Sequence, residues 1–294
     1  MGGSSRIWIL RAVLAVSIAA VALTPVGRSV ADRAGGAGPR DRSDHKVWPW
    51  LRYPSHDAIR SARRFAAARG DVSFAVIDPS VGLRGYDYDR QLSSASVSKA
   101  LLLAAELRRL EREDVALDAA TRALLEPMIT YSDNRAADAV YARVGDEGLE
   151  EVASRAGMRD FEVTPGFWGG DRITAADMAR FFYRLEHNLA GRYRGYAKAL
   201  LARITSVERW GIPQAVGRGW SVWFKGGWRP PGQKHTSGPV SNQAALLEHR
   251  GGERLALAVL TDEAPWGGGF EAIEGVARRL LSRSPPYRGG WQAP

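Results

Sequence analysis

The spacing of apolar positions along the chain differs between its ends and its middle. Two runs with the composition of strands, DVSFAVID and LRGYDYD, lie between residues 71 and 89. Three more, WSVWFK, SNQAALLEH and RLALAVLTD, lie between residues 220 and 262. Between the two groups, apolar residues recur with helical spacing over most of residues 96–205. This pattern predicts one sheet built from both ends of the chain, with a helical region inserted into it.

Turn residues and two further helical patterns complete this outline. We expect a helix from Ser55 to Ala68 before the first strand and a closing helix near Phe270 to Ser282. Pro and Gly between Asp78 and Gly82 predict a turn that joins the first two strands. Arg250 to Glu253 predicts a hairpin that joins the last two.

The N-terminal segment has the order of features of a secretory signal. Arg6 and Arg11 precede an apolar run from Ala12 to Leu23, and the small residues Ser29 to Ala31 follow. We expect a signal peptide over residues 1–31 and export of the mature protein to the cell envelope or beyond. An uncleaved anchor is the alternative, and this alternative alone would attach the protein to a membrane.

Composition predicts the other boundaries and limits the partners. Residues 32–52 are rich in Gly, Pro and charge, which is typical of a linker; a folded domain over 53–285 and a tail over 286–294 are expected to follow. The formal net charge of +9 points, in an exported protein, to anionic envelope polymers rather than to nucleic acid. The chain has no cysteine, which excludes disulfides and a thiolate nucleophile. We expect a monomer.

A serine-rich stretch, LSSASVSK, directly precedes the apolar pattern ALLLAAEL. Ser96 and Lys99 are three residues apart, so a helix that starts at Ser96 would place both on one face. The apolar helix would bury the lysine amine, and burial lowers the pKa of a lysine toward the range in which it accepts a proton from serine. A serine N-cap followed by a solvated lysine is the simpler interpretation of the same residues.

Two further motifs contain residue types that suit the same chemistry. Ser132, Asp133 and Asn134 stand just before a predicted helix, and alternate residues in an extended turn would point Ser132 and Asn134 into one cleft. Lys225 and two glycines end an apolar strand, where a cation and flexible backbone would line a groove at the sheet edge. Taken alone, the first motif is more often a helix cap and the second an ordinary strand end.

Together, the motifs S-x-x-K, S-D-N and K-G-G resemble those of the penicillin-recognising serine hydrolases, most closely the class A β-lactamases. The resemblance extends from about Phe74 to Leu281 and includes ITAADMARFF, which looks like the helix after the family's omega-shaped loop. It implies an α/β fold of the α+β type, β-lactamase/transpeptidase-like, in which an antiparallel sheet from both termini is flanked by helices and an all-helical subdomain is inserted. Two of the five lysines occupy motif positions, where a titratable amine or a compact cation is wanted and Arg would not serve.

The resemblance implies a catalytic role for three residues. Ser96 would attack a carbonyl carbon, with Lys99 as its base or proton relay. Ser132 would pass a proton to the departing nitrogen, and Asp133 would brace its own turn. Neither a metal nor a cofactor is expected, and the histidines lack the spacing of metal ligands.

The resemblance also implies how a substrate would be bound. Asn134 would hydrogen-bond the substrate amide, and Lys225 would hold its carboxylate. The backbone N–H groups of Ser96 and Trp228 would bind the oxyanion, with Gly227 beside them in the groove.

Three features depart from the family pattern. Gly226 stands where the family carries a Thr or Ser hydroxyl, so one anchor for a substrate carboxylate is missing. Trp228 is a bulky neighbour of the expected oxyanion site. The family's loop carries a glutamate that activates the deacylating water, whereas the short loop EVTPGFWGGDR offers Glu162 and Asp171 without the flanking pattern. Fast acylation and slow deacylation are therefore expected.

These observations leave three functions open. The leading one is an exported serine acyl hydrolase that acts on a β-lactam or a D-alanyl amide through a covalent acyl-enzyme. One alternative is a D,D-peptidase-like cell-wall enzyme that acts on a peptidoglycan stem peptide. The other is a non-catalytic module that binds peptidoglycan or penicillin, which the missing glutamate favours.

Overall fold

The computed structural model describes residues 54–230, 239–262 and 268–281. The predicted signal peptide, linker and C-terminal tail lie outside these residues. Within the described ranges, no helix combines the length and the apolar character needed to cross a membrane.

A five-stranded antiparallel sheet joins the two ends of the chain. Its strands, in spatial order, are β2 (Gly82–Tyr86), β1 (Val72–Asp78), β7 (Arg254–Asp262), β6 (Val240–His249) and β5 (Trp220–Arg229). β1 pairs with β7 in a register that sets Ala75 opposite Ala258. All side chains of β1 from Val72 to Val76 are buried, because both faces of the sheet are covered at this strand. The predicted sheet from both ends of the chain is confirmed.

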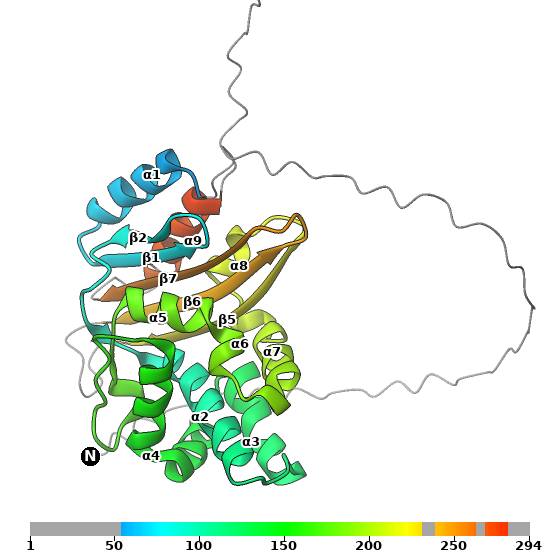
Figure 1. The fold of residues 1–294 in the computed structure, drawn as a ribbon. Helices are drawn as coiled ribbons and strands as arrows, with labels where there is room; N and C mark the ends of the chain where they lie inside the picture. The colour runs from blue at the N-terminus through cyan, green and yellow to red at the C-terminus, as the bar shows by residue number, and fades with distance from the viewer. Residues whose placement is uncertain (1–53, 231–238, 263–267, 282–294) are drawn as a thin grey trace, which may run out of the picture. The chain divides into compact units, whose positions relative to one another are not determined.

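Helices cover the two faces of this sheet (Figure 1). α1 (His56–Ala67) and α9 (Gly268–Leu281) pack against each other on one face, and α5 (Ala175–Tyr183) packs on β1 and β7 from the other. Gly275 of α9 meets the ring of Phe65 so closely that a Cβ at residue 275 would lie 2.2 Å from the ring. The helices from the two ends of the chain are thus in direct contact.

The inserted helices extend the same core. The longer ones are α2 (Lys99–Arg112), α3 (Ala119–Thr130), α4 (Asn134–Ala156) and α7 (Arg194–Ala202). α2 is buried without interruption from Lys99 to Leu107 and packs on α4 and α3. Its buried acid, Glu106, is compensated by Arg109 at 2.8 Å and by Arg143 at 3.0 Å. The predicted buried helix after the serine-rich stretch is confirmed.

Short elements connect these units. They are β3 (Leu92–Ser93), η1 (Ala95–Ser98), η2 (Trp168–Gly170), β4 (Arg172–Ile173), α6 (Leu185–Asn188), η3 (Gly191–Tyr193), η4 (Ser206–Glu208) and α8 (Ile212–Ala215). β3 and β4 pair with each other and hold the start of η1 beside the loop that precedes α5.

Candidate active site

Ser96 lies in the short 3-10 helix η1, which leads directly into α2. From the sequence, we consider an α-helix that starts at Ser96. In the structure, Ser96 lies in a tighter 3-10 turn, and the α-helix begins at Lys99. Ala95 has φ 48°, a left-handed backbone that alanine adopts only where its surroundings enforce it. The turn leaves Ser96 partly exposed, while the three residues that follow are buried.

Lys99 is fully buried and turns its amine toward the segment before α4. Its Nζ donates to Asn134 Oδ1 at 2.7 Å, to Ser132 Oγ at 3.3 Å and to the backbone oxygen of Ser132. Burial, assisted by the nearby charge of Lys225 and opposed by the carboxylate of Glu208, lowers the pKa of Lys99 to about 7. At neutral pH, a large fraction of this amine is therefore unprotonated and can accept a proton.

Ser132, Asp133 and Asn134 form the turn into α4. Asp133 is the N-cap, and its carboxylate accepts the N–H of Ala136 at 2.7 Å. Ser132 has φ 59°, so the predicted extended turn is wrong. The chain reverses at Ser132 in a left-handed conformation because it has to enter the helix two residues later. Ser132 and Asn134 nevertheless both reach Lys99.

Lys225 approaches the Ser132 hydroxyl from the sheet. It lies in β5, is fully buried, and donates from Nζ to Ser132 Oγ at 3.0 Å and to Gly226 O at 2.8 Å. Burial lowers the pKa of Lys225 to about 8. The Ser132 hydroxyl therefore lies between two lysine amines, and the positive charge of Lys225 favours proton transfer from it.

Gly227 allows β5 to pass directly against η1. A Cβ at this position would lie 2.4 Å from the backbone N of Ser96 and 2.7 Å from that of Val97, so any side chain here would force the strand away from the turn. Trp228 follows and is 41% exposed. The close approach brings the backbone of residues 227–228 to the N–H groups of η1, which is where the resemblance places an oxyanion site.

The other face of β5 explains the absence of a hydroxyl at Gly226. A Cβ at this position would lie 2.9 Å from the ring of Trp210 and 3.4 Å from Nε2 of Gln243. Trp210 is held by stacking on Phe270, with ring centroids 4.2 Å apart, and by a hydrogen bond from Gln243 Nε2 to its backbone oxygen. An indole thus fills the space into which a Thr or Ser side chain would project.

The loop between α4 and α5 places an aromatic ring next to Lys99. Trp168 is 6% exposed, and the centre of its ring lies 5.0 Å from Lys99 Nζ. Its Nε1 donates to Asp138 Oδ1 at 2.9 Å. In the part of the chain that the structure describes, no carboxylate forms an ion pair with Lys99. Sequence analysis missed Trp168, because a tryptophan between a phenylalanine and two glycines is equally typical of packing.

Arg229 fastens this loop to the sheet. Its guanidinium is 5% exposed and donates to Ser93 Oγ at 3.2 Å and to the backbone oxygen of Gly169. Ser94 Oγ donates to the backbone oxygen of Trp168 at 3.2 Å. The residue after Trp228 therefore positions the ring that faces Lys99, a role that no pattern in the sequence indicated.

The two carboxylates of the loop lie in different environments. Glu162 is exposed, and its backbone pairs with Arg172 at 3.1 Å and 2.8 Å. Asp171 is fully buried; its Oδ1 accepts the N–H of Thr164 at 3.0 Å, and its Oδ2 has no hydrogen-bond partner among the described residues. Burial raises the pKa of Asp171 to about 7, while the N–H of Thr164 and the nearby Ser98 hydroxyl lower it. The hydrogen bond from Thr164 ties the Asp171 carboxylate to its own loop.

The sequence-predicted site residues therefore meet at one place, where α2, the turn into α4 and β5 converge. Nowhere in the described ranges do three or more His, Asp or Glu side chains gather in a way that would hold a metal ion.

Comparison with solved structures identifies the fold. Among solved structures, a beta-lactamase from Sphaerobacter thermophilus DSM 20745 matches with a TM-score of 0.64 and 21% identity over 76% of this chain and 95% of that one. A class A beta-lactamase from Mycobacterium abscessus matches with a TM-score of 0.64 and 21% identity over 76% and 98%. The protein PBP-A matches with a TM-score of 0.65 and 17% identity over 77% and 95%. These likenesses show that the β-lactamase/transpeptidase-like fold is present.

The sequence comparisons give a family. A search among curated proteins gave no match. A sequence model described as the beta-lactamase enzyme family matches residues 119–283, which is more than half of the chain and includes the S-D-N and K-G-G motifs. The chain therefore belongs to the beta-lactamase enzyme family and is a β-lactamase-like serine hydrolase.

Proposed function

We propose that this protein is an exported hydrolase that acylates Ser96 with a β-lactam or a D-alanyl amide and releases the acyl group slowly. The observation that carries the proposal is the buried Lys99 amine, three residues from Ser96, with a pKa of about 7. A buried lysine with a lowered pKa is the group that a serine nucleophile needs as its base. Export rests on the signal-like order of Arg6, the apolar run and the small residues after it.

Acylation would proceed by three coupled transfers. Neutral Lys99 takes the proton of Ser96 as the Ser96 oxygen bonds to the carbonyl carbon. The negative charge on the carbonyl oxygen is held by the backbone N–H groups of Ser96 and Trp228. Ser132 then passes its proton to the departing nitrogen as the carbon–nitrogen bond breaks, and protonated Lys99, whose Nζ lies 3.3 Å from Ser132 Oγ, returns a proton to Ser132. The charge of Lys225, 3.0 Å from Ser132 Oγ, lowers the cost of that transfer.

Deacylation would be slow because water lacks a positioned base. Lys99 faces the ring of Trp168, Glu162 is exposed, and the Asp171 carboxylate is hydrogen-bonded within its own loop. Loss of a general base slows a step by about 10²- to 10⁴-fold. A single-residue mutant of PBP-A has been solved as an acyl-enzyme complex with penicillin G, so a neighbour with this fold forms the kind of adduct proposed here.

Two features of the site affect how a substrate carboxylate would be held. Lys225 is fully buried and bonded to Ser132, and the indole of Trp210 takes the place of a hydroxyl at Gly226. Both features weaken the anchoring of a substrate carboxylate. A D,D-peptidase-like wall enzyme is a second candidate beside a β-lactamase, and the lack of a positioned base for water favours a penicillin-binding module without turnover as another.

The test is intact-mass analysis after incubation with a panel of penicillins and D-Ala-D-Ala peptides. The expected result is one covalent adduct per chain with penicillin, lost in Ser96→Ala while the thermal unfolding midpoint stays within about 2 °C. Rapid turnover without an adduct would contradict slow deacylation. Labelling that persists in Ser96→Ala would remove Ser96 as the nucleophile.

A further inference from the structure

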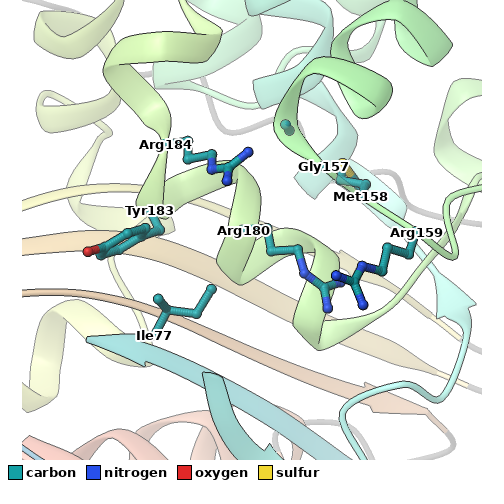
Figure 2. Close-up of a pocket in the computed structure, with 8 residues that line it drawn as sticks. Ile77, Gly157, Met158, Arg159, Arg180, Tyr183 and Arg184 are labelled. Carbon is teal, nitrogen blue, oxygen red and sulfur yellow. The ribbon is translucent and has the colours of Figure 1, made fainter. Parts of the chain in front are cut away.

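A cleft lined by three arginines opens where the ends of α4 and α5 meet. Its volume is about 460 Å³, and its lining includes Arg159, Arg180 and Arg184 together with the ring of Tyr183 (Figure 2). This size falls in the range of small-molecule pockets. The cleft adjoins the C-terminal end of α4, whereas Asn134 of the candidate active site begins that helix. The cleft and the active site are therefore separate places.

One of these arginines lies against the backbone that ends α4. Gly157 caps the helix with φ 73°, a left-handed conformation that favours glycine. A Cβ at Gly157 would lie 3.4 Å from Nη1 of Arg184. The Arg184 guanidinium therefore lies within van der Waals distance of the end of α4. Figure 2 shows Arg159 and Arg180 extending into the same cleft from the segment after α4 and from α5.

One buried carboxylate compensates part of this positive charge. Asp177 Oδ1 accepts from Arg180 Nη1 at 2.7 Å and from the backbone N of Arg159 at 2.8 Å, and its Oδ2 accepts the N–H of Asp160 at 3.0 Å. Of the three arginines, Arg180 is the one that forms an ion pair with a described residue. Two of the three guanidinium charges in the cleft therefore lack a carboxylate partner within the described part of the chain.

We propose that this cleft binds a phosphate monoester attached to an uncharged ring, such as a phosphorylated sugar. A guanidinium presents parallel donors that match phosphate oxygens. A phosphate monoester carries about −1.5 to −2 charges at pH 7, which balances the two uncompensated arginines. Ile77, Met158 and Tyr183 supply apolar surface in the lining against which a ring can lie. The binding site is independent of the serine chemistry proposed above.

Isothermal titration at fixed ionic strength tests this assignment with ribose 5-phosphate, ribose, inorganic phosphate and acetate as probes. Ribose 5-phosphate is expected to bind, ribose is expected not to bind, and inorganic phosphate is expected to compete. Arg159→Gln and Arg184→Gln should each weaken binding by about tenfold or more. The matched control is Arg194→Gln, which removes an exposed arginine outside the cleft and should change affinity by less than about twofold. Ser96→Ala should leave binding unchanged.

Three outcomes would overturn the proposal. No binding of ribose 5-phosphate to the wild-type protein would remove the site. Equal weakening by Arg194→Gln and the two cleft variants would show general attraction to a basic surface. Binding of acetate as tightly as phosphate would reassign the cleft to carboxylates. Penicillin adduct formation is measured on the same samples. An adduct without ribose 5-phosphate binding would contradict this proposal alone, whereas binding without an adduct would contradict the serine chemistry alone.

Discussion

At the scale of single residues, the burial of Lys99 at the start of α2 gives its amine the lowered pKa that the proposed chemistry requires. An amine at the head of an apolar helix loses water, and its pKa falls to about 7. Asn134 Oδ1 and the backbone oxygen of Ser132 then fix the direction of its Nζ. A second buried amine, Lys225, keeps a higher pKa of about 8. The pair therefore provides a base and a cation at the same pH.

The pH dependence of acylation follows from these two values. Lys99 acts as a neutral base, so the rate should rise as pH increases through about 7. Lys225 acts as a cation, so the rate should fall as pH increases through about 8. Because the amines interact, the two limbs of the bell belong to the pair. The measurement is the adduct formation rate with a reporter penicillin from about pH 5.5 to about 9.5, and a level profile would contradict the assignment.

Replacement of the base by a permanent cation separates the two roles of Lys99. Lys99→Arg keeps the charge but stays protonated above about pH 12, so it should lose acylation by about 10²- to 10⁴-fold, as Lys99→Ala does. Lys198→Arg, in an ion pair with Glu186 at 2.6 Å outside the site, is the matched control and should keep the wild-type rate. If Lys99→Arg kept most of the acylation rate, Lys99 would act through its positive charge and not as a base.

At the scale of elements, the loop from α4 to α5 distinguishes this site from the family pattern. Arg229 and Ser94 hold the backbone around Trp168, and Asp138 holds its indole. The sequence showed that this loop is short, but it did not show which side chain faces Lys99. The side chain that faces Lys99 is determined by the contacts that Arg229 of β5 and Ser94, just before η1, make with the loop.

A carboxylate in place of the ring should accelerate deacylation. Trp168→Glu would put a base within reach of Lys99 and open space for water. We expect the acyl-enzyme lifetime to fall by about 10- to 100-fold relative to Trp168→Gln, which opens the same space without a base. Both variants should be less stable, because each removes a buried aromatic side chain. Time-resolved mass spectrometry of the penicillin adduct checks this, and equal lifetimes in the two variants would refute it.

The buried Asp171 should make stability depend on pH through this loop. Its folded-state pKa of about 7 exceeds the usual value near 3.8, so the native state binds the proton more tightly than the unfolded chain. The free energy of unfolding therefore falls as pH rises from about 4 to about 7, and the penalty is complete above about 7.

Asp171→Asn removes this titration. The variant should be more stable than the wild type by about 2–4 kcal/mol at pH 8 and show little gain near pH 4. Urea unfolding at the two pH values measures the difference. Glu162→Gln, an exposed carboxylate in the same loop, should show no such change between them. A gain of equal size at both pH values would mean that Asp171 does not titrate as its burial requires.

At the scale of the whole molecule, the sequence predicted the sheet better than the site. The runs that became β1, β6 and β7 are long and apolar, so their periodicity is clear in the sequence. The paired two-residue strands β3 and β4 are too short to leave a pattern. The motif residues could be selected by their chemistry, whereas the left-handed turn at Ser132 and the ring at Lys99 arise from contacts between distant segments.

The contact between α1 and α9 allows a test of how far the site depends on the whole fold. A side chain at Gly275 would overlap the ring of Phe65, on the face of the sheet opposite α5. Gly275→Val should cost about 1–3 kcal/mol through overpacking and lower the unfolding midpoint by about 2–8 °C. Acylation at 25 °C should stay unchanged, because η1, α4 and β5 keep their contacts.

On heating, the labelling capacity of Gly275→Val should disappear at its own lowered midpoint, since the sheet joins both ends of the chain into one unit. The control is Gly195→Val, where an added Cβ meets nothing within 4 Å; its midpoint should move by less than half as much. Circular dichroism and penicillin labelling over the same temperature range provide the comparison. Labelling that outlasts the loss of secondary structure, or that fails well below it, would show that the helical insertion unfolds separately from the sheet.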